Sequence, residues 1–294
     1  MKATSLSLAV ITITMSVAAA ASGLSQSILR ASRRTFSTTK FAMAAAGPPA
    51  SGADMMASFS KPLVGNAVAD AMAALATADA VCFDVDSTVI QEEGIDVLAD
   101  FLGKGAAVAA LTREAMGGAM KFQDALRQRL ELLEPSRDQI MECLEKHPLQ
   151  LTPGVEALIE TLHELRKDVY LVSGGFRIMI EPVAKAACVG KTNIYANTIL
   201  FDEHGNYAGF DEAEPTSRDM GKPAALEMIQ AKHGYKTMVM VGDGATDAQA
   251  KPPAKAFIGF GGVIVREAVK AKACWFVEDF ADMQKVLKEF SSKV

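Results

Sequence analysis

The sequence has few of the features that mark a metal-thiolate, disulfide-rich or membrane protein. Its four cysteines, at positions 82, 143, 188 and 274, form no Cys-x-x-Cys motif and have no histidine at metal-ligand spacing. This excludes a zinc finger and a disulfide framework, and we expect small buried thiols in a reducing compartment. After residue 50 no uninterrupted apolar run reaches the length that spans a bilayer, so we expect no membrane association of the mature protein.

Acidic residues are absent from the first 50 positions, which carry five basic residues. Since the whole chain has a net charge of −5, residues 51–294 carry −10. An acidic body offers no electrostatic footprint for nucleic acid or for an anionic membrane, and we expect neither as a partner. A homodimer is compatible with the sequence.

The same 50 residues have the composition of a targeting leader. An apolar stretch, LSLAVITITMSVAAAA, precedes the Arg- and Ser-rich segment SILRASRRTFSTTK. This two-part pattern favours a soluble protein directed to a plastid. A mitochondrial presequence, or a tail without an address on a cytoplasmic protein, are the alternatives.

Three short apolar runs predict the strands of a parallel sheet. AVCFDVD (80–86), DVYLVSGG (168–175) and TMVMVGDG (237–244) are continuously hydrophobic, as strands buried on both faces are, and each ends in small polar residues. AFIGFGG and CWFVEDF are further strand candidates. Helical patterns lie between the strands, one of them GVEALIETLHELRK with Thr152 as its N-cap. The alternation predicts an α/β fold with a Rossmann-like parallel sheet.

Residues 93–150 differ, because successive segments there have helical periodicity. We predict an all-helical cap, inserted after the first strand above the carboxyl edge of the sheet, where it can act as a lid. The predicted organisation is a leader over 1–50, an N-terminal helix over 51–79, an α/β core from 80–92 and 151–294, and the cap over 93–150.

Acidic side chains follow two of the predicted strands. Asp84 and Asp86 are two residues apart and share one side of an extended chain, and Asp243 follows a later strand. Because parallel strands end at one edge of a sheet, these groups should converge there with Ser173. Carboxylates this close repel unless a divalent cation neutralises them. Oxygen-only ligands favour Mg²⁺, with a structural Ca²⁺ as the weaker alternative.

Other polar motifs are ordinary when taken singly. Ser173-Gly174-Gly175 alone is a turn, and Lys222 alone is a solvated lysine. In order along the chain, however, DVDSTVIQEEGIDVLADFLG, TREAMGGAMKF, LVSGGFR, GDGATDAQA and AFIGFGG resemble the motifs of the haloacid dehalogenase superfamily and, within it, of the phosphoserine phosphatase family. The resemblance covers about residues 80–285 and implies a HAD-like core with a helical cap.

The resemblance implies a Mg²⁺-dependent phosphoric monoester hydrolase that releases L-serine from O-phospho-L-serine, the last step of L-serine biosynthesis. It assigns Asp84 as the nucleophile that forms an aspartyl-phosphate and Asp86 as the general acid and base. Mg²⁺ would be held by Asp84, Asp243 and the backbone carbonyl of Asp86, with Asp247 in support. The groups that would bind the phosphate are Ser173, Gly174, Gly175 and Lys222.

The resemblance also indicates how the substrate is selected. Arg129 lies near an apolar helix face, where a snorkelling arginine is the ordinary interpretation; the family makes it the partner of the substrate carboxylate. Glu93, otherwise an acid at a helix N-terminus, would receive the substrate ammonium group. The further substrate contacts that the resemblance implies are Met116, Gly117, Phe122, Thr246 and Arg266.

The sequence departs from the family pattern at Pro223, where a glycine often follows the lysine. Proline fits a first helical turn, so we expect Lys222 to keep its place. Two alternatives stay open. One is a related phosphatase or phosphotransferase that acts on another small phosphomonoester. The other is a receiver-like signalling module, which would lack both the cap and a second acid such as Asp86.

Overall fold

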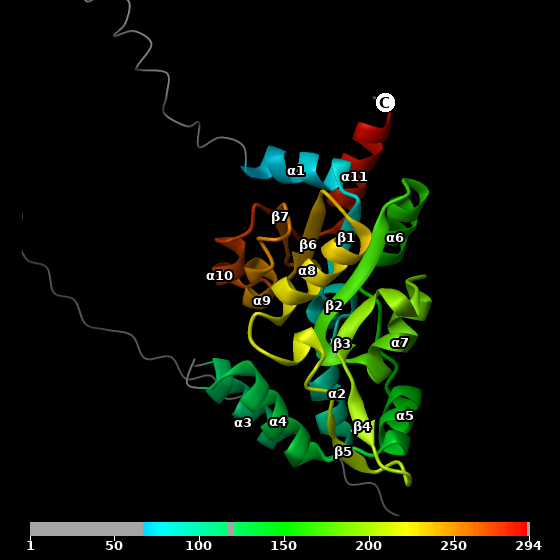
Figure 1. Cartoon of the computed structure of the whole chain (residues 1–294), viewed down its shortest axis with the longest axis vertical. Helices are drawn as coiled ribbons and strands as arrows, with labels where there is room; N and C mark the ends of the chain where they lie inside the picture. The colour runs from blue at the N-terminus through cyan, green and yellow to red at the C-terminus, as the bar shows by residue number, and fades with distance from the viewer. Residues whose placement is uncertain (1–66, 117–119, 293–294) are drawn as a thin grey trace, which may run out of the picture. The chain divides into compact units, whose positions relative to one another are not determined.

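The computed structural model describes residues 67–116 and 120–292, and within them a six-stranded parallel sheet has the order β3-β2-β1-β6-β7-β8 (Figure 1). The predicted parallel sheet is confirmed, including both further strand candidates. The predicted leader and the first part of the predicted N-terminal helix lie outside the described residues. The strands are β1 (Ala80–Phe83), β2 (Asp168–Phe176), β3 (Ile194–Asn197), β6 (Met238–Gly242), β7 (Ala256–Phe260) and β8 (Trp275–Val277).

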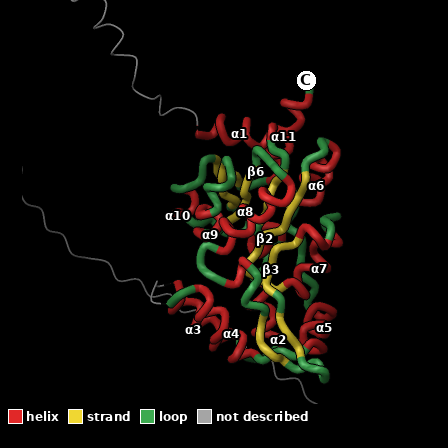
Figure 2. Tube along the Cα trace, viewed as in Figure 1, coloured by secondary structure: helices red, strands yellow, loops and turns green. Residues whose placement is uncertain are grey.

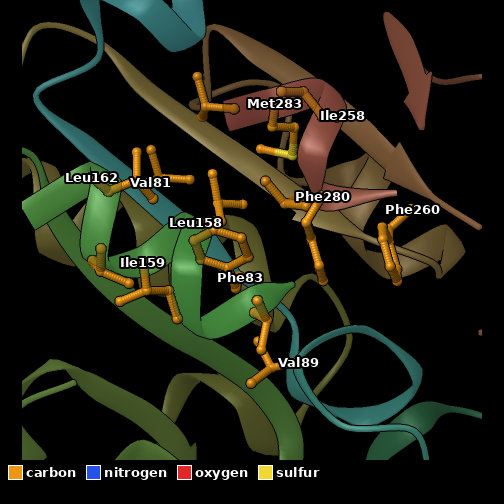
Figure 3. Close-up of a cluster of buried hydrophobic side chains, with 14 of the residues drawn as sticks. Val81, Phe83, Val89, Leu158, Ile159, Leu162, Ile258, Phe260, Phe280 and Met283 are labelled. Carbon is orange, nitrogen blue, oxygen red and sulfur yellow. The ribbon is translucent and has the colours of Figure 1, made fainter. Parts of the chain in front are cut away.

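Helices cover both faces of this sheet (Figures 1 and 2). Because successive strand residues point to opposite faces, Val81 and Phe83 pack on one side and Ala80 and Cys82 on the other. Figure 3 shows the first of these two clusters, in which the ring of Phe83 meets side chains from α6 and α11. The first face is covered by α1 (Ala67–Thr77), α6 (Val155–Glu164), α7 (Arg177–Ala186) and α11 (Phe280–Ser291), and the second by α8 (Gly221–His233), α9 (Ala245–Gln249) and α10 (Glu267–Lys270).

Four helices follow β1 before the chain returns to the core: α2 (Gly94–Phe101), α3 (Gly105–Met116), α4 (Phe122–Leu133) and α5 (Arg137–Lys146). They pack around another hydrophobic cluster, which includes Leu126 and Leu130 and also takes in Phe176 of β2 and Met179 of α7. An antiparallel hairpin that the sequence analysis did not predict, β4 (Ile199–Phe201) and β5 (Tyr207–Phe210), packs on the same cluster. The two chain crossings between core and helices run side by side, since the Gln91 N–H donates to the Gln150 carbonyl at 3.0 Å.

Two local predictions are wrong. Helix α6 begins after Gly154, which has a φ of 83° and serves as the N-cap, so Thr152 does not cap it. Cys82 and Cys143 are buried as predicted, but Cys188 is exposed and Cys274 is half-buried. Pro223 lies in the first turn of α8, as predicted, and Gly234 ends that helix in the left-handed conformation. None of the described helices combines the length and hydrophobicity needed to cross a bilayer.

Candidate active site

The polar strand ends lie together at the carboxyl edge of the sheet. Asp84 directly follows β1, Asp243 directly follows β6, and Ser173 lies near the end of β2. Strand β1 pairs with both β2 and β6, so the three strand ends are neighbours. Lys222 reaches the same place from the first turn of α8, beside Pro223.

Lys222 is a buried ammonium group held between two carboxylates. Its Nζ lies 2.8 Å from Oδ2 of Asp84 and 2.5 Å from Oδ1 of Asp247. Burial opposes the charge, but the carboxylates of Asp247 and Asp84 outweigh that penalty and raise the pKa of Lys222. The lysine therefore stays protonated at neutral pH and places a fixed positive charge beside the Asp84 carboxylate.

Three buried carboxylates form a compact cluster. Oxygen atoms of Asp84, Asp243 and Asp247 lie within 4.8 Å of one another. Burial, followed by the Asp84 carboxylate, raises the pKa of Asp243. An all-oxygen set of this kind fits a hard divalent cation. The Asp86 carboxylate does not belong to the cluster, whereas Asp247, predicted only as a supporting residue, supplies its third carboxylate.

The Asp86 carboxylate lies near Asp84 and is held by two hydrogen bonds. Its Oδ1 accepts the Gly94 N–H at 2.7 Å, and its Oδ2 accepts the Ser173 hydroxyl at 3.4 Å. Burial, followed by the carboxylates of Glu93 and Asp84, raises the pKa of Asp86 to about 7. A carboxyl group with this pKa can give up and take a proton near neutral pH.

The Ser173-Gly174-Gly175 segment makes a close-fitting cradle. Ser173 is fully buried, and its Oγ accepts the Gly175 N–H at 2.9 Å. A Cβ on Gly175 would lie 2.9 Å from an Asp86 oxygen, and one on Gly174 would lie 3.0 Å from the Phe122 ring. Only glycine lets the backbone approach the Asp86 carboxylate and the Phe122 ring this closely.

Glu93 and Arg266 connect the N-terminus of α2 to the carboxylate cluster. Glu93 precedes α2 and accepts the Ser87 hydroxyl at 2.8 Å, and burial raises its pKa. The Arg266 guanidinium donates to Oδ2 of Asp243 at 2.8 Å and lies 3.5 Å from Glu93. Arg266, predicted as a substrate contact, therefore also pairs with Asp243.

Arg129 lies on α4, half-buried and near the site. Its Nε donates to the Ala125 carbonyl at 3.2 Å. Among residues 67–116 and 120–292, no carboxylate lies within 4.0 Å of the Arg129 guanidinium. Burial lowers the pKa of Arg129, and the charges of Asp96, Glu93 and Asp86 oppose that effect. The guanidinium is thus within the electrostatic reach of two site acids without being paired to either.

The remaining predicted contacts are distributed around these groups. Phe122 begins α4 and covers Gly174. Thr246 is exposed in the first turn of α9. Met116 ends α3, and its side chain and Gly117 lie outside the described residues.

Sequence reasoning missed three polar partners of the site. The Thr88 hydroxyl lies 3.4 Å from Oδ1 of Asp243, and Ser87, with a φ of 51°, turns the chain and donates to Glu93. Asn197 donates its amide to the Gly174 carbonyl at 2.7 Å. The hydroxyl pair directly after Asp86 and the position of Asn197 at a strand end were the available signals.

Comparison with known proteins agrees with this geometry. Residues 78–251 match the haloacid dehalogenase-like hydrolase family. Phosphoserine phosphatase of Mus musculus is 52% identical over 213 residues, covering 72% of this chain and 95% of the mouse protein. The chloroplastic phosphoserine phosphatase of Arabidopsis thaliana is 51% identical, covering 70% of each chain.

A solved structure gives the same result. That of a phospho-aspartyl intermediate analogue of phosphoserine phosphatase superimposes with a TM-score of 0.60 at 28% identity, covering 71% of this chain and 97% of the other. The chain therefore belongs to the haloacid dehalogenase-like hydrolases and, among them, to the phosphoserine phosphatase family.

Proposed function

We propose that the chain is a Mg²⁺-dependent phosphatase that hydrolyses O-phospho-L-serine to L-serine and phosphate, the last step of L-serine biosynthesis. The observation that carries the proposal is the buried contact of Asp84 with Lys222 beside Asp86, beneath helices that supply Arg129. The substrate is supported by a mouse relative named phosphoserine phosphatase that is 52% identical.

In the first step, a carboxylate oxygen of Asp84 attacks phosphorus and the bond to the serine oxygen breaks. Asp86, which is partly protonated near neutral pH because burial raises its pKa to about 7, gives its proton to the departing oxygen. The product is an aspartyl-phosphate on Asp84 and free serine. Lys222 lowers the negative charge around the phosphoryl oxygens, which is what this transfer requires of its surroundings.

In the second step, Asp86 works in the reverse direction. Its carboxylate takes a proton from a water molecule, whose oxygen attacks phosphorus and releases phosphate from Asp84. The hydrogen bond from Gly94 keeps Asp86 oriented in both steps. The Ser173 hydroxyl and the N–H of Gly174 would bind the phosphoryl oxygens.

The carboxylates of Asp84, Asp243 and Asp247 form the set that would hold Mg²⁺, with the carbonyl of Asp86 as a further oxygen. When bound, the ion supplies charge neutralisation at the phosphoryl group. Thr88 and Arg266 donate to Asp243 and orient it.

Two charged side chains outside the phosphate pocket, Arg129 and Glu93, would recognise the amino-acid part of the substrate. Arg129 would pair with the substrate carboxylate, and the electric field of Glu93 would attract its ammonium. Together they select a zwitterion against a sugar phosphate. Lesser contacts are proposed from Met116, Gly117, Phe122, Thr246 and Arg266.

We also propose that residues 1–50 are an organelle leader, favouring a plastid, and that residues 93–150 are a cap on a core formed by 80–92 and 151–294. A chloroplastic relative with 51% identity supports the first of these. Fusion of residues 1–50 to a fluorescent protein tests it, and a cytoplasmic signal would contradict it.

The function is tested by phosphate release from a panel of phosphomonoesters, with Mg²⁺ and with a chelator. We expect phosphoserine to be the best substrate, chelation to stop turnover, and the Asp84→Asn variant to be inactive. Equal rates on sugar phosphates would favour a related phosphatase of other specificity. A chain that retains one phosphate on an aspartate without turnover would favour a receiver-like module.

A further inference from the structure

Helix α4 of the proposed cap domain has no N-terminal capping side chain from its own segment of the chain. The residue before its first turn, Lys121, makes no side-chain capping hydrogen bond. The first N–H groups of a helix lack intrahelical acceptors, and an uncapped N-terminus frays. The helix carries Phe122 at its first position and Arg129 two turns later, so fraying there would displace both.

A residue of the proposed core supplies the missing N-terminal acceptor. Oδ1 of Asp219, in the loop before α8, accepts the N–H of Phe122 at 3.1 Å. In return the side-chain oxygen of Gln123 accepts the backbone N–H of Asp219 at 3.4 Å. The two bonds are reciprocal, as in a capping box, but they engage the N–H of the first helical residue and the side chain of the second, from a partner 96 residues away in the chain. The negative charge of Asp219 also favours its place at a helix N-terminus.

The same loop leads directly to the catalytic lysine. Asp219 precedes Lys222 by three residues, and Phe122 lies against Gly174 of the phosphate cradle. A second contact supports the arrangement, since Arg127 of α4 lies 2.5 Å from Glu212 of the core. That ion pair is exposed, as the two hydrogen bonds of Asp219 are, and it contributes little alone.

We propose that Asp219 and Gln123 are positioning residues that join the end of the phosphate-binding loop to cap helix α4. The Phe122 N–H at the start of α4 has its acceptor only when the cap domain lies against the core. The pair therefore favours the closed arrangement, in which Phe122 covers Gly174 and Arg129 contacts the substrate. This inference rests on the proposed function, because the positioned groups are assigned there to phosphoserine.

The test compares Asp219→Ala with Asp279→Ala. Asp279 is an exposed aspartate that caps α11 within the core by accepting the Ala281 N–H at 2.8 Å, which makes it a matched control. We expect Asp219→Ala to lower kcat/KM for phosphoserine by about 2- to 30-fold, mainly through KM, while Asp279→Ala leaves KM unchanged. Asp219→Asn keeps an acceptor oxygen and should retain most of the activity.

A double-mutant cycle separates positioning from independent surface effects. If Asp219 and Gln123 act as one unit, Asp219→Ala with Gln123→Ala is no worse than Asp219→Ala alone. Multiplied effects, or equal KM values for Asp219→Ala and Asp279→Ala, would overturn the inference.

Amide hydrogen exchange decides the inference without reference to activity. Exchange in the first turn of α4 should become faster in Asp219→Ala and stay unchanged in Asp279→Ala. If the wild-type chain hydrolyses no phosphoserine, the proposed function fails, and the exchange result alone decides whether Asp219 caps the helix. Unchanged exchange in α4 would refute the cap.

Discussion

At the carboxyl edge of the sheet, Lys222 lies within 2.8 Å of two buried carboxylates, whereas in the cap the half-buried guanidinium of Arg129 donates to a backbone carbonyl of its own helix. At the edge the cations Lys222 and Arg266 are already paired with acids, whereas Arg129 is a cation that a ligand can pair. The difference fits the two tasks that we propose for these groups. Phosphoryl transfer needs groups fixed before the substrate arrives, while recognition of a carboxylate needs a cation not yet neutralised.

The pairing at the edge also makes its residues interdependent. Lys222 contacts both Asp84 and Asp247, and Arg266 contacts both Asp243 and Glu93. A change at Lys222 leaves the buried carboxylates of Asp84 and Asp247 alone, so Lys222 variants should affect stability as well as turnover. Cap variants should affect substrate affinity and leave the free energy of unfolding nearly unchanged.

The largest effect is expected at Lys222. Lys222→Ala should lower the free energy of unfolding by about 3–5 kcal/mol, because Asp84 and Asp247 are left as buried unpaired carboxylates. Urea denaturation in a chelating buffer measures the change. Lys167→Ala is the matched control, since this buried lysine donates to the carbonyls of Ala76 and Ala78 instead of pairing with an acid. An equal loss of unfolding free energy in both variants would show that the pairing of Lys222 with acids adds nothing beyond the burial of a lysine.

The buried Asp86 carboxyl should make the free energy of unfolding depend on pH. Burial first, then Glu93 and Asp84, raises its pKa from 3.8 to about 7 in the folded chain. A raised folded-state pKa means that the group contributes most stability below about pH 4 and loses it as the pH rises through about 7.

The variant Asp86→Asn removes this dependence. In chelating buffer it should be more stable than the wild type at pH 8 by roughly 2–4 kcal/mol, with the difference shrinking toward pH 5, although it is inactive. Urea midpoints at several pH values provide the measurement. A difference that does not vary with pH would show that Asp86 titrates normally.

Arg129 should show the opposite behaviour. Arg129→Ala should lower kcat/KM for phosphoserine about 10- to 150-fold, with an unchanged free energy of unfolding. Phosphoethanolamine, which lacks the carboxylate, is the control substrate, and its slower turnover should stay the same. Glu93→Gln should in turn reduce the preference for substrates that carry an ammonium group. Equal losses on both substrates would assign Arg129 to packing.

Residues at strand ends were predictable because the chain's periodicity fixes where parallel strands stop. Asp84, Asp243 and Ser173 could be placed at one edge from their positions after apolar runs alone. Lys222 depended on the family resemblance, since its position before a helix does not reveal that its ammonium reaches Asp84.

Contacts between segments far apart in the chain were beyond the sequence. The hairpin of β4 and β5 packs on the cap through Ile199 and Phe210, and short strands of this kind carry little periodic signal. Asp219 has no distinguishing neighbours in sequence, and its role depends on a helix whose first residue is Phe122. Tertiary contacts of this sort depend on how the elements pack rather than on local patterns.

The smallest change in the free energy of unfolding is expected at Thr152. Its sign distinguishes the predicted N-cap at Thr152 from the helix start after Gly154. The position of Thr152 before Pro153 predicted an N-cap, yet α6 starts after Gly154, and the buried Thr152 Oγ1 is without a hydrogen-bond partner among the described residues. A buried hydroxyl without a partner opposes folding, and a methyl group in its place fills the same volume. Thr152→Val should therefore raise the free energy of unfolding by about 0.5–1 kcal/mol.

If the hydroxyl instead caps α6 in solution, the same substitution should lower the free energy of unfolding by about 1 kcal/mol. Thr161→Val is the matched control, because this buried threonine on α6 donates to the Ala157 carbonyl at 2.8 Å and accepts from Gln284. Its loss should be destabilising whichever start of α6 is correct. The two threonines lie on either side of that start, so opposite signs for the two variants would locate it at Gly154.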